Sequence, residues 1–483
     1  MTPNHESKRP SDRKDRGGLS LTEEAAPRIP LLTALSAAAF ALLLIFVAVA
    51  PFPYGAILPG GNLEIELFAF VIAALAFISR PRKVELGALR VPVYSLIAIA
   101  ALGVFQLLPL GSAFLRRLSP VSLQTHEGAS AILRLYGRAG TTPTISIAPE
   151  ETRSTILLTL AFAALLASSA ILLTTRSRRR QLTFVLFATA IGQVIYAALA
   201  NSDIDRIHGA FVNPNHFAGY LEIALAFAFG TIWAEILMGR ERVEGIRDHG
   251  ERLEKLAVPL LLRVLLWGVI ATGIMLTRSR GGILAAAVVT LVLLVMATLQ
   301  RSHGARRKRA AIGAAVAVTL GLTFVAVTTG SAPLLRFLSA DPRDVGTDDR
   351  VAIWRTSVQA WHLFPNAGSG LGAFREAFRR RQPAELHGLV EQAHNDFLQL
   401  LVTGGWVGAA LGAIVFLSML ALLARAWRRQ KHREESAFIL AGFGALLALT
   451  LHGAVDFNMS VPAIPATLTV MAGAAWSATV KER

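Results

Sequence analysis

A histidine at the junction of a polar and an apolar stretch is the residue best placed for chemistry in this sequence. The junction reads QAHNDFL at 392–398, and the apolar stretch then continues to Leu423. Ionisable residues at such a boundary are costly to place and often mark functional sites. A neutral imidazole accepts a proton from a hydroxyl group, and a following helix N-terminus disfavours its protonated form. His394 is therefore a candidate general base, although a hydrogen-bonded interfacial histidine is the plainer alternative. Asn395 or Asp396 could orient it or cap the following helix, and Asp396 is also a candidate substrate-binding residue.

A short polar segment at 206–218, RIHGAFVNPNHFA, carries candidate ligands for an anion or a sugar. Arg206 suits a phosphate group, because a guanidinium binds phosphate oxygens in a bidentate manner. Asn213 and Asn215 suit sugar hydroxyl groups. The alternative is an ordinary loop in which Asn215 caps the next helix.

A second polar segment, TRSRGG at 277–282, places two arginines in a tight turn between apolar runs. Its glycines allow a ligand to approach the backbone, and the N-terminus of the next helix adds partial positive charge. We favour Arg280 as a phosphate ligand and leave open whether Arg278 shares this role. The alternative is a pair of arginines that extend toward the membrane surface.

Two further charged residues are candidates for the same site. Arg350 follows two aspartates and is the best site candidate among the arginines of a long polar loop. Asp456, in HGAVDFN at 452–458, ends an apolar run and could contact an acceptor or one of the arginines. The alternative for Asp456 is an interfacial ion pair.

The composition indicates the elements that must position these residues. Hydrophobic residues make up 53% of the 483-residue chain, and charged residues make up 17%. The apolar residues come in runs of about 17–25, the length of a membrane-spanning helix. We therefore predict an all-α polytopic membrane protein with about twelve spans. They cover 31–50, 64–79, 91–108, 154–175, 182–200, 217–238, 258–277, 282–299, 311–328, 397–423, 437–455 and 463–479.

The distribution of charge predicts the topology. The formal net charge is +16, but the basic residues cluster between apolar runs, as at 176–180 and 425–433. The positive-inside rule places these clusters and both termini in the cytoplasm, and no basic domain indicates a nucleic-acid partner. Residues 1–30 are predicted to be a disordered cytoplasmic tail. Residues 31–483 form one membrane domain, with a large, partly helical outside loop at 329–396 between spans nine and ten.

The sequence lacks the residues that several kinds of catalysis and metal binding require. There is no cysteine, so thiol catalysis and disulfides are excluded. The sequence has no HExxH, P-loop or GxSxG motif and no visible metal-binding cluster. An aspartate-x-aspartate at 203–205 lies in a short external loop where nucleotide sugars are not expected. We therefore expect no metal and no cofactor.

Five segments together resemble the O-antigen ligase family, which shares a core with O-antigen and exopolysaccharide polymerases. They are RIHGAFVNPNHFAGY at 206–220, TRSRGG at 277–282, DRVAIWR at 349–355, PNAGSGLGAF at 365–374 and AHNDFLQLLVTGG at 393–405. They occur in the family's order and lie between about 182 and 460, which we take as the ligase-like core. The first 150 residues carry no recognised motif.

The resemblance implies a metal-independent, inverting glycosyltransferase of the bacterial inner membrane with its active site facing the periplasm. Its donor would be an undecaprenyl-diphosphate-linked glycan. Its acceptor would be a lipid A-core sugar in a ligase or another repeat unit in a polymerase. Membrane lipids would surround the protein. Arg206 and Arg280 resemble the diphosphate-binding arginines, and His394 resembles the residue that activates the acceptor hydroxyl. Arg278 stands where many members have a small residue. A polymerase is the close alternative, and a transporter is the distant one.

Overall fold

The computed structural model describes residues 30–79, 86–200, 206–301 and 347–479, apart from Pro53 and Pro59. Over these residues the secondary structure is helical, with no strand. The predicted disordered tail, up to residue 29, and the predicted ninth span at 311–328 lie outside this part of the chain. So does the start of the large outside loop.

Ten helices in the described residues are long and apolar enough to cross a membrane. Each coincides with a predicted span, which confirms a helical, multi-pass membrane protein. The last apolar helix, α17 (Ala463–Ser477), lies at the predicted twelfth span but has only 15 residues. The total of twelve spans stays a prediction. The ten long helices are α1 (Pro30–Val49), α2 (Gly61–Ile78), α3 (Arg90–Leu107), α6 (Pro149–Leu172), α7 (Arg176–Ala200), α8 (Pro214–Arg242), α9 (His249–Leu276), α10 (Arg280–Arg301), α15 (Asp396–Arg429) and α16 (Arg433–His452).

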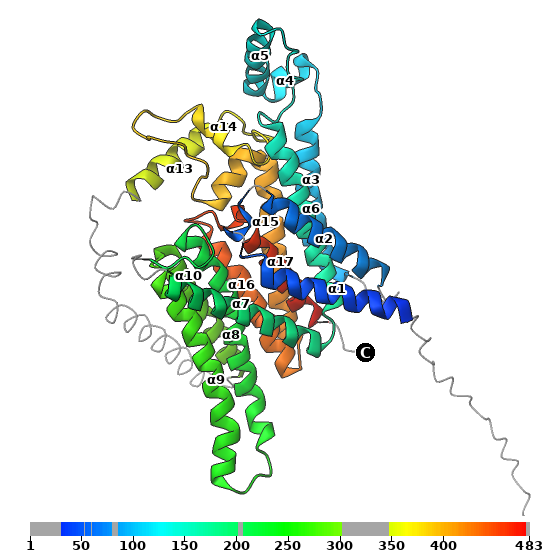
Figure 1. The fold of residues 1–483 in the computed structure, drawn as a ribbon, viewed down its shortest axis with the longest axis vertical. Coiled ribbons are helices and arrows are strands. Elements are labelled where there is room, and N and C mark those ends of the chain that lie inside the picture. Colours follow the sequence, from blue (N-terminus) through cyan, green and yellow to red (C-terminus); the bar gives the residue numbers. More distant parts are fainter. Residues whose placement is uncertain are drawn as a thin grey trace, which may run out of the picture.

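Helices α8 and α16 form the centre of the helix bundle (Figure 1). Small residues bring them close together: a Cβ atom on Gly230 of α8 would lie 2.7 Å from Cβ of Ala441 on α16. Such contacts drive helix association in membranes, where apolar burial alone contributes little. Outer helices expose apolar side chains instead, such as Leu261 and Leu265 of α9, which suit a lipid environment.

Four short helices form a layer, here called the outer layer, at one end of the bundle. They are α4 (Ser112–Leu118), α5 (Pro120–Leu135), α13 (Thr347–Trp361) and α14 (Phe374–Arg379). Figure 1 shows this layer at the end opposite the connection between α8 and α9. Its core includes the buried rings of Phe364, Phe374 and Phe378. The described part of the large loop is thus partly helical, as predicted.

Helix α15 is broken at Gly405, whose φ of 61° and ψ of −163° are not helical. The glycine-rich segment 365–370 lies against this break and supplies hydrogen bonds. Trp406 N donates to Pro365 O over 2.9 Å, and Gly370 N donates to Thr403 O over 3.1 Å. The fully buried Gln106 of α3 donates from Nε2 to Ala367 O (2.6 Å) and to Thr403 O (2.9 Å). These bonds satisfy backbone groups that a helix break would otherwise leave unpaired in an apolar environment.

The contact between segment 365–370 and the break requires glycine on both sides. A Cβ on Gly368 would lie 2.1 Å from Thr403 O, and one on Gly405 would lie 2.3 Å from Asn366 O. The segment therefore has a structural role: it holds the first part of α15, which begins next to His394, against α3 and the outer layer.

We expect Gly405→Ala to destabilise the folded protein, because alanine disfavours the backbone conformation of this position and its Cβ would clash with Asn366 O. Backbone strain of this kind costs roughly 1–3 kcal/mol, and the clash adds to it. Gly404→Ala is the matched control, since the nearest neighbour of its new Cβ lies at an ordinary 3.5 Å. Thermal unfolding in detergent should show a lower midpoint for Gly405→Ala than for Gly404→Ala. Equal midpoints would contradict the structural role of this contact.

Candidate active site at the outer ends of α8, α10 and α15

The backbone of His394 is held in an unusual conformation just before α15. Its φ of 50° lies in the left-handed region, which non-glycine residues seldom adopt. Trp354 Nε1 of α13 donates to the His394 carbonyl over 3.2 Å. Asn395 caps α15 by accepting from Leu398 N (2.9 Å) and also donates to Ala454 O (2.9 Å). The capping role that the sequence left open between two residues thus belongs to Asn395.

The imidazole of His394 is suited to accept a proton. Its side chain is 29% exposed, and Nδ1 lies 3.9 Å from Asp456 Oδ1. The edge of Phe457 packs against the ring, with centroids 4.7 Å apart. Burial lowers the pKa of His394 from its ordinary value, and the charge of Arg350 lowers it further, whereas Asp456 raises it. The main cause of this lowering is desolvation.

The carboxylate of Asp456 connects the surrounding elements. Its side chain is almost fully buried. Oδ2 accepts from Asn215 Nδ2 over 2.7 Å and from a guanidinium nitrogen of Arg350 over 3.4 Å. Oδ1 accepts from Phe457 N over 2.9 Å. Arg350 also donates to Val455 O over 2.9 Å. Asp456 thus joins the start of α8 to α13 and to His394.

The chain of contacts continues from Asp456 to Arg206. Arg206 donates to Asn215 Oδ1 over 2.8 Å and from Nε to Thr277 O over 2.9 Å. The alternative that an asparagine of this loop caps α8 holds for Asn213 and not for Asn215, because Asn213 occupies the cap and accepts from Asn215 N over 2.9 Å. Pro214 takes the first helical position, where its missing N–H costs nothing. The Asn215 side chain therefore bridges Arg206 and Asp456.

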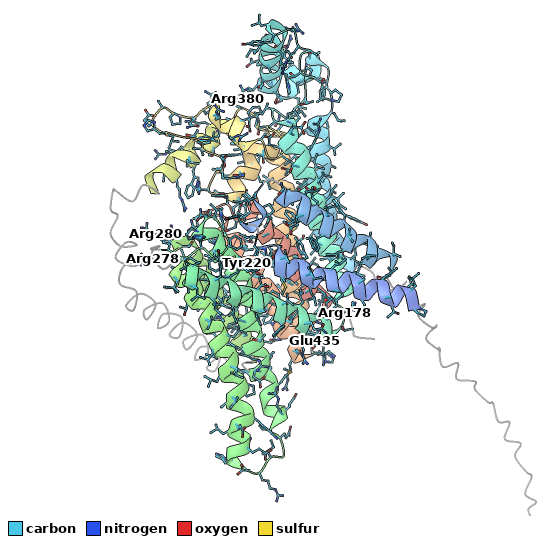
Figure 2. The ribbon with its side chains drawn as sticks, in the orientation of Figure 1. Arg178, Tyr220, Arg278, Arg280, Arg380 and Glu435 are labelled. Carbon is cyan, nitrogen blue, oxygen red and sulfur yellow. The ribbon has the colours of Figure 1, made fainter. Side chains whose placement is uncertain are left out.

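The turn at 277–282 lies next to Arg206 and carries the other two candidate arginines. Arg278 has a φ of 51°, and Arg280 is the first residue of α10. Figure 2 shows both side chains where α9 ends and α10 begins. Arg178 of α7 and Glu435 of α16 lie far from them in the same view. Three arginines are thus gathered at the N-terminus of a helix, an arrangement that favours anions.

The carboxylate and the backbone N of Asp396 contact backbone groups of the segment after α16. Both carboxylate oxygens lie 3.2 Å from Met459 N, and its own N donates to Gly453 O over 2.8 Å. These contacts join the start of α15 to the loop after α16. A role of Asp396 in binding substrate stays a prediction.

Three ionisable residues near this site had no role in the sequence-based prediction. His216 Nε2 lies 3.9 Å from Asp456 Oδ1, and its ring packs edge-on to Phe457 at 4.5 Å. Glu222 of α8 and His452 of α16 form a fully buried pair. A glutamate inside an apolar run was a usable signal for Glu222. Its partner lies on a helix far away in the sequence, and only the fold shows that contact.

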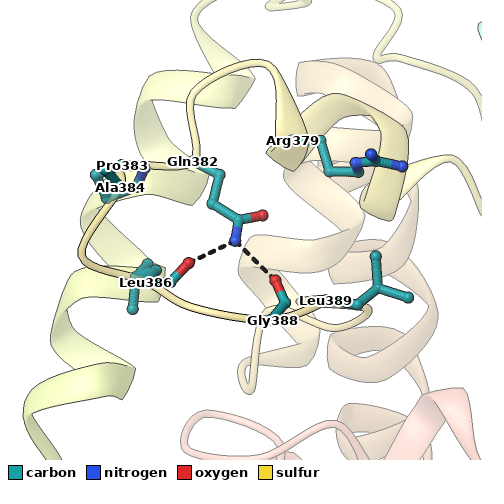
Figure 3. Close-up of a pocket in the computed structure, with 7 residues that line it drawn as sticks. All are labelled: Arg379, Gln382, Pro383, Ala384, Leu386, Gly388 and Leu389. Carbon is teal, nitrogen blue, oxygen red and sulfur yellow. Dashed lines mark hydrogen bonds between the residues drawn. The ribbon is translucent and has the colours of Figure 1, made fainter.

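The outer layer also contains an open pocket of about 520 Å³ (Figure 3). The loop 382–389 curves around Gln382, whose Nε2 donates to Leu386 O (2.7 Å) and Gly388 O (2.9 Å). Arg379 lies at the edge of this pocket. None of the predicted site residues lines it.

Residues 264–411 match the family model described as O-Antigen ligase. The matched region includes Arg278, Arg280, Arg350 and His394 and stops before Asp456. No curated protein sequence matches the chain. The match confirms the resemblance over four of the five sequence segments, and the segment at 206–220 lies outside the matched region.

The two charges beside His394 should shift its titration in opposite directions. Only neutral His394 accepts a proton, and its pKa lies below the ordinary 6.5, so transfer activity should decline on the acid side only below about that pH. Arg350→Gln removes a charge that lowers this pKa, so the acid limb should move to higher pH. Asp456→Asn removes a charge that raises it, so the limb should move to lower pH.

The pH profile of each variant, normalised to its own plateau, is the measurement. A shift of both acid limbs in the same direction would contradict the electrostatic assignment. A general loss of structure would not move the two limbs in opposite directions. Arg355→Gln, on the same helix as Arg350, serves as the control and should keep the wild-type profile.

Proposed function

We propose that this chain, whose residues 264–411 match the O-antigen ligase family model, transfers a glycan from an undecaprenyl-diphosphate donor to a sugar hydroxyl of lipid A-core. The proposal refines a coarser conclusion, that the chain is a membrane glycosyltransferase of the ligase or polymerase type. One observation carries it: Asp456 contacts both the candidate base His394 and Asn215, which binds Arg206. A base and an anion-binding arginine are thus tied to one carboxylate.

Arg206, Arg278 and Arg280 would bind the diphosphate of the donor. In the reaction the diphosphate is the leaving group, and negative charge develops on it as the bond to the sugar breaks. Preorganised cations that face this charge stabilise the transition state. The N-terminus of α10 adds partial positive charge at the same place. Arg350, held by Val455 O and Asp456, completes the set from the acceptor side.

His394 would act on the acceptor. Its Nδ1 faces Asp456, which leaves Nε2 for the hydroxyl group. The acceptor oxygen forms a bond to the anomeric carbon while the bond from that carbon to the phosphate oxygen breaks. The diphosphate leaves with the electron pair, and the hydroxyl proton passes to His394. Attack opposite the leaving group inverts the anomeric configuration.

The remaining predicted residues would bind sugar, with the membrane setting the orientation. Asn213, Asn215, Asp396 and Asp456 lie around His394 and Arg206 and offer polar groups for glycan hydroxyls. The polyprenyl chain would lie along apolar helix surfaces. In this proposal the protein lies in the bacterial inner membrane, with both termini in the cytoplasm and the active site in the periplasm.

Complementation tests this function directly. In a strain that lacks its own O-antigen ligase, the wild-type chain should restore glycan attached to lipid A-core on a polysaccharide gel. His394→Ala should reduce it by at least about 10²-fold, the usual contribution of a general acid or base. Arg280→Ala should reduce it by roughly 10²-fold or more, the usual cost of losing one group that stabilises charge in the transition state. His387→Ala, an exposed histidine of the same outer layer, should restore the wild-type pattern.

All variants are compared at equal amounts in the membrane fraction. Restoration of wild-type glycan by both His394→Ala and Arg280→Ala would reject the mechanism. Restoration of chain length in a polymerase-deficient strain, without ligation, would reject lipid A-core as the acceptor.

A further inference from the structure

Glu222 and His452 form an ionisable pair inside the helix bundle. Both side chains are fully inaccessible to solvent, and His452 Nδ1 lies 2.8 Å from Glu222 Oε1. Among the described residues, neither Glu222 Oε2 nor His452 Nε2 has a hydrogen-bond partner. A buried net charge is expensive, so the pair is most stable when the two side chains share one proton and are neutral overall. The mechanism described above does not use either residue.

The pair lies directly against the start of α10. A Cβ on Gly281 would lie 3.0 Å from His452 Cδ2, and one on Gly282 would lie 3.2 Å from Glu222 Oε1. The two glycines of the TRSRGG turn thus bring the helix N-terminus onto the pair. Arg280 precedes them on the same turn. The buried pair therefore lies behind the place where we propose that the diphosphate binds.

Other charged groups lie on the segments that neighbour the pair. They are His216 of α8, Arg206 of the segment before α8, Arg278 and Arg280 of the 277–282 turn, Asp396 of α15, and Asp456 after α16. Helix α17 contributes no titratable side chain. The arginines oppose a further proton on the pair, and the aspartates favour one. A bound diphosphate would offset the arginines and change this balance.

We propose that Glu222 and His452 form a proton-binding site that takes up one further proton, on Glu222, when a diphosphate binds at the start of α10. The inference rests on the proposed function. A donor diphosphate brings two negative charges. The released product carries one more, because the oxygen that was bonded to the sugar becomes a free phosphate oxygen. A proton on Glu222 removes a negative charge from behind this group. By linkage, protonation of the pair and diphosphate binding favour each other.

Calorimetry in buffers of different ionisation enthalpy measures this proton directly. The probe is a short-chain polyprenyl diphosphosugar, since a diphosphate esterified at both ends does not titrate near neutral pH. A His394→Gln background removes the titration of the candidate base. With Glu222 present, binding should take up as much as one proton, and affinity should rise by up to about tenfold for each unit of decrease in pH. Glu222→Gln should abolish both effects.

Glu235→Gln is the matched control. Glu235 lies on the same helix, is also buried, and pairs with Arg242 and Arg263 away from the site. This variant should keep the proton uptake and the pH dependence. If Glu222→Gln does not fold, His452→Gln gives a second readout. It should also remove the uptake, because a buried carboxyl without a cationic partner is already neutral before the ligand binds.

Full proton uptake in Glu222→Gln, or binding to the His394→Gln protein without any uptake, would overturn this inference and leave the proposed function intact. Failure of the wild-type protein to bind the diphosphosugar at all would count against the proposed function itself.

Discussion

The buried carboxylate of Asp456 is the interaction on which the site depends. Asn215, Arg350 and the backbone of Phe457 all donate to it, and His394 and His216 lie at equal distances from one of its oxygens. A buried charge is tolerated only when such partners compensate it, and removal of one partner of a buried ion pair costs about 3–5 kcal/mol. The ends of α8, α13 and α16 are therefore held together by the same contacts that arrange the candidate catalytic groups.

A second constraint acts on the other side of His394. Helix α15 breaks at Gly405, and the glycine-rich segment 365–370 and Gln106 satisfy the backbone groups at the break. Non-helical backbone survives at the level of a membrane only where protein satisfies it in this way. The short helical stretch that starts beside His394 is thus supported from α3, and the position of the histidine does not depend on a free loop.

These constraints explain why the polar residues gather at one end of a helical bundle. The small residues between α8 and α16 bring the two helices together, so that their outer ends present Asn215 and Asp456 to each other. Deeper in the same helix pair, Glu222 and His452 meet beneath the start of α10. One packing interface therefore carries both the visible site and the buried ionisable pair.

The sequence by itself determined the helical, membrane-spanning class, because span length and charge asymmetry are local properties set by the bilayer. It also identified His394, Arg206 and Arg280 as chemically unusual residues. The family match includes Arg280 and His394. Which residues touch each other was decided only by the tertiary structure. The cap of α8 belongs to Asn213 because of the position of Pro214, so Asn215 turns toward an aspartate more than two hundred residues away. The partner of Glu222, the role of the glycines at 365–370 and the break in α15 likewise depend on contacts between distant segments, which no local pattern of residues specifies.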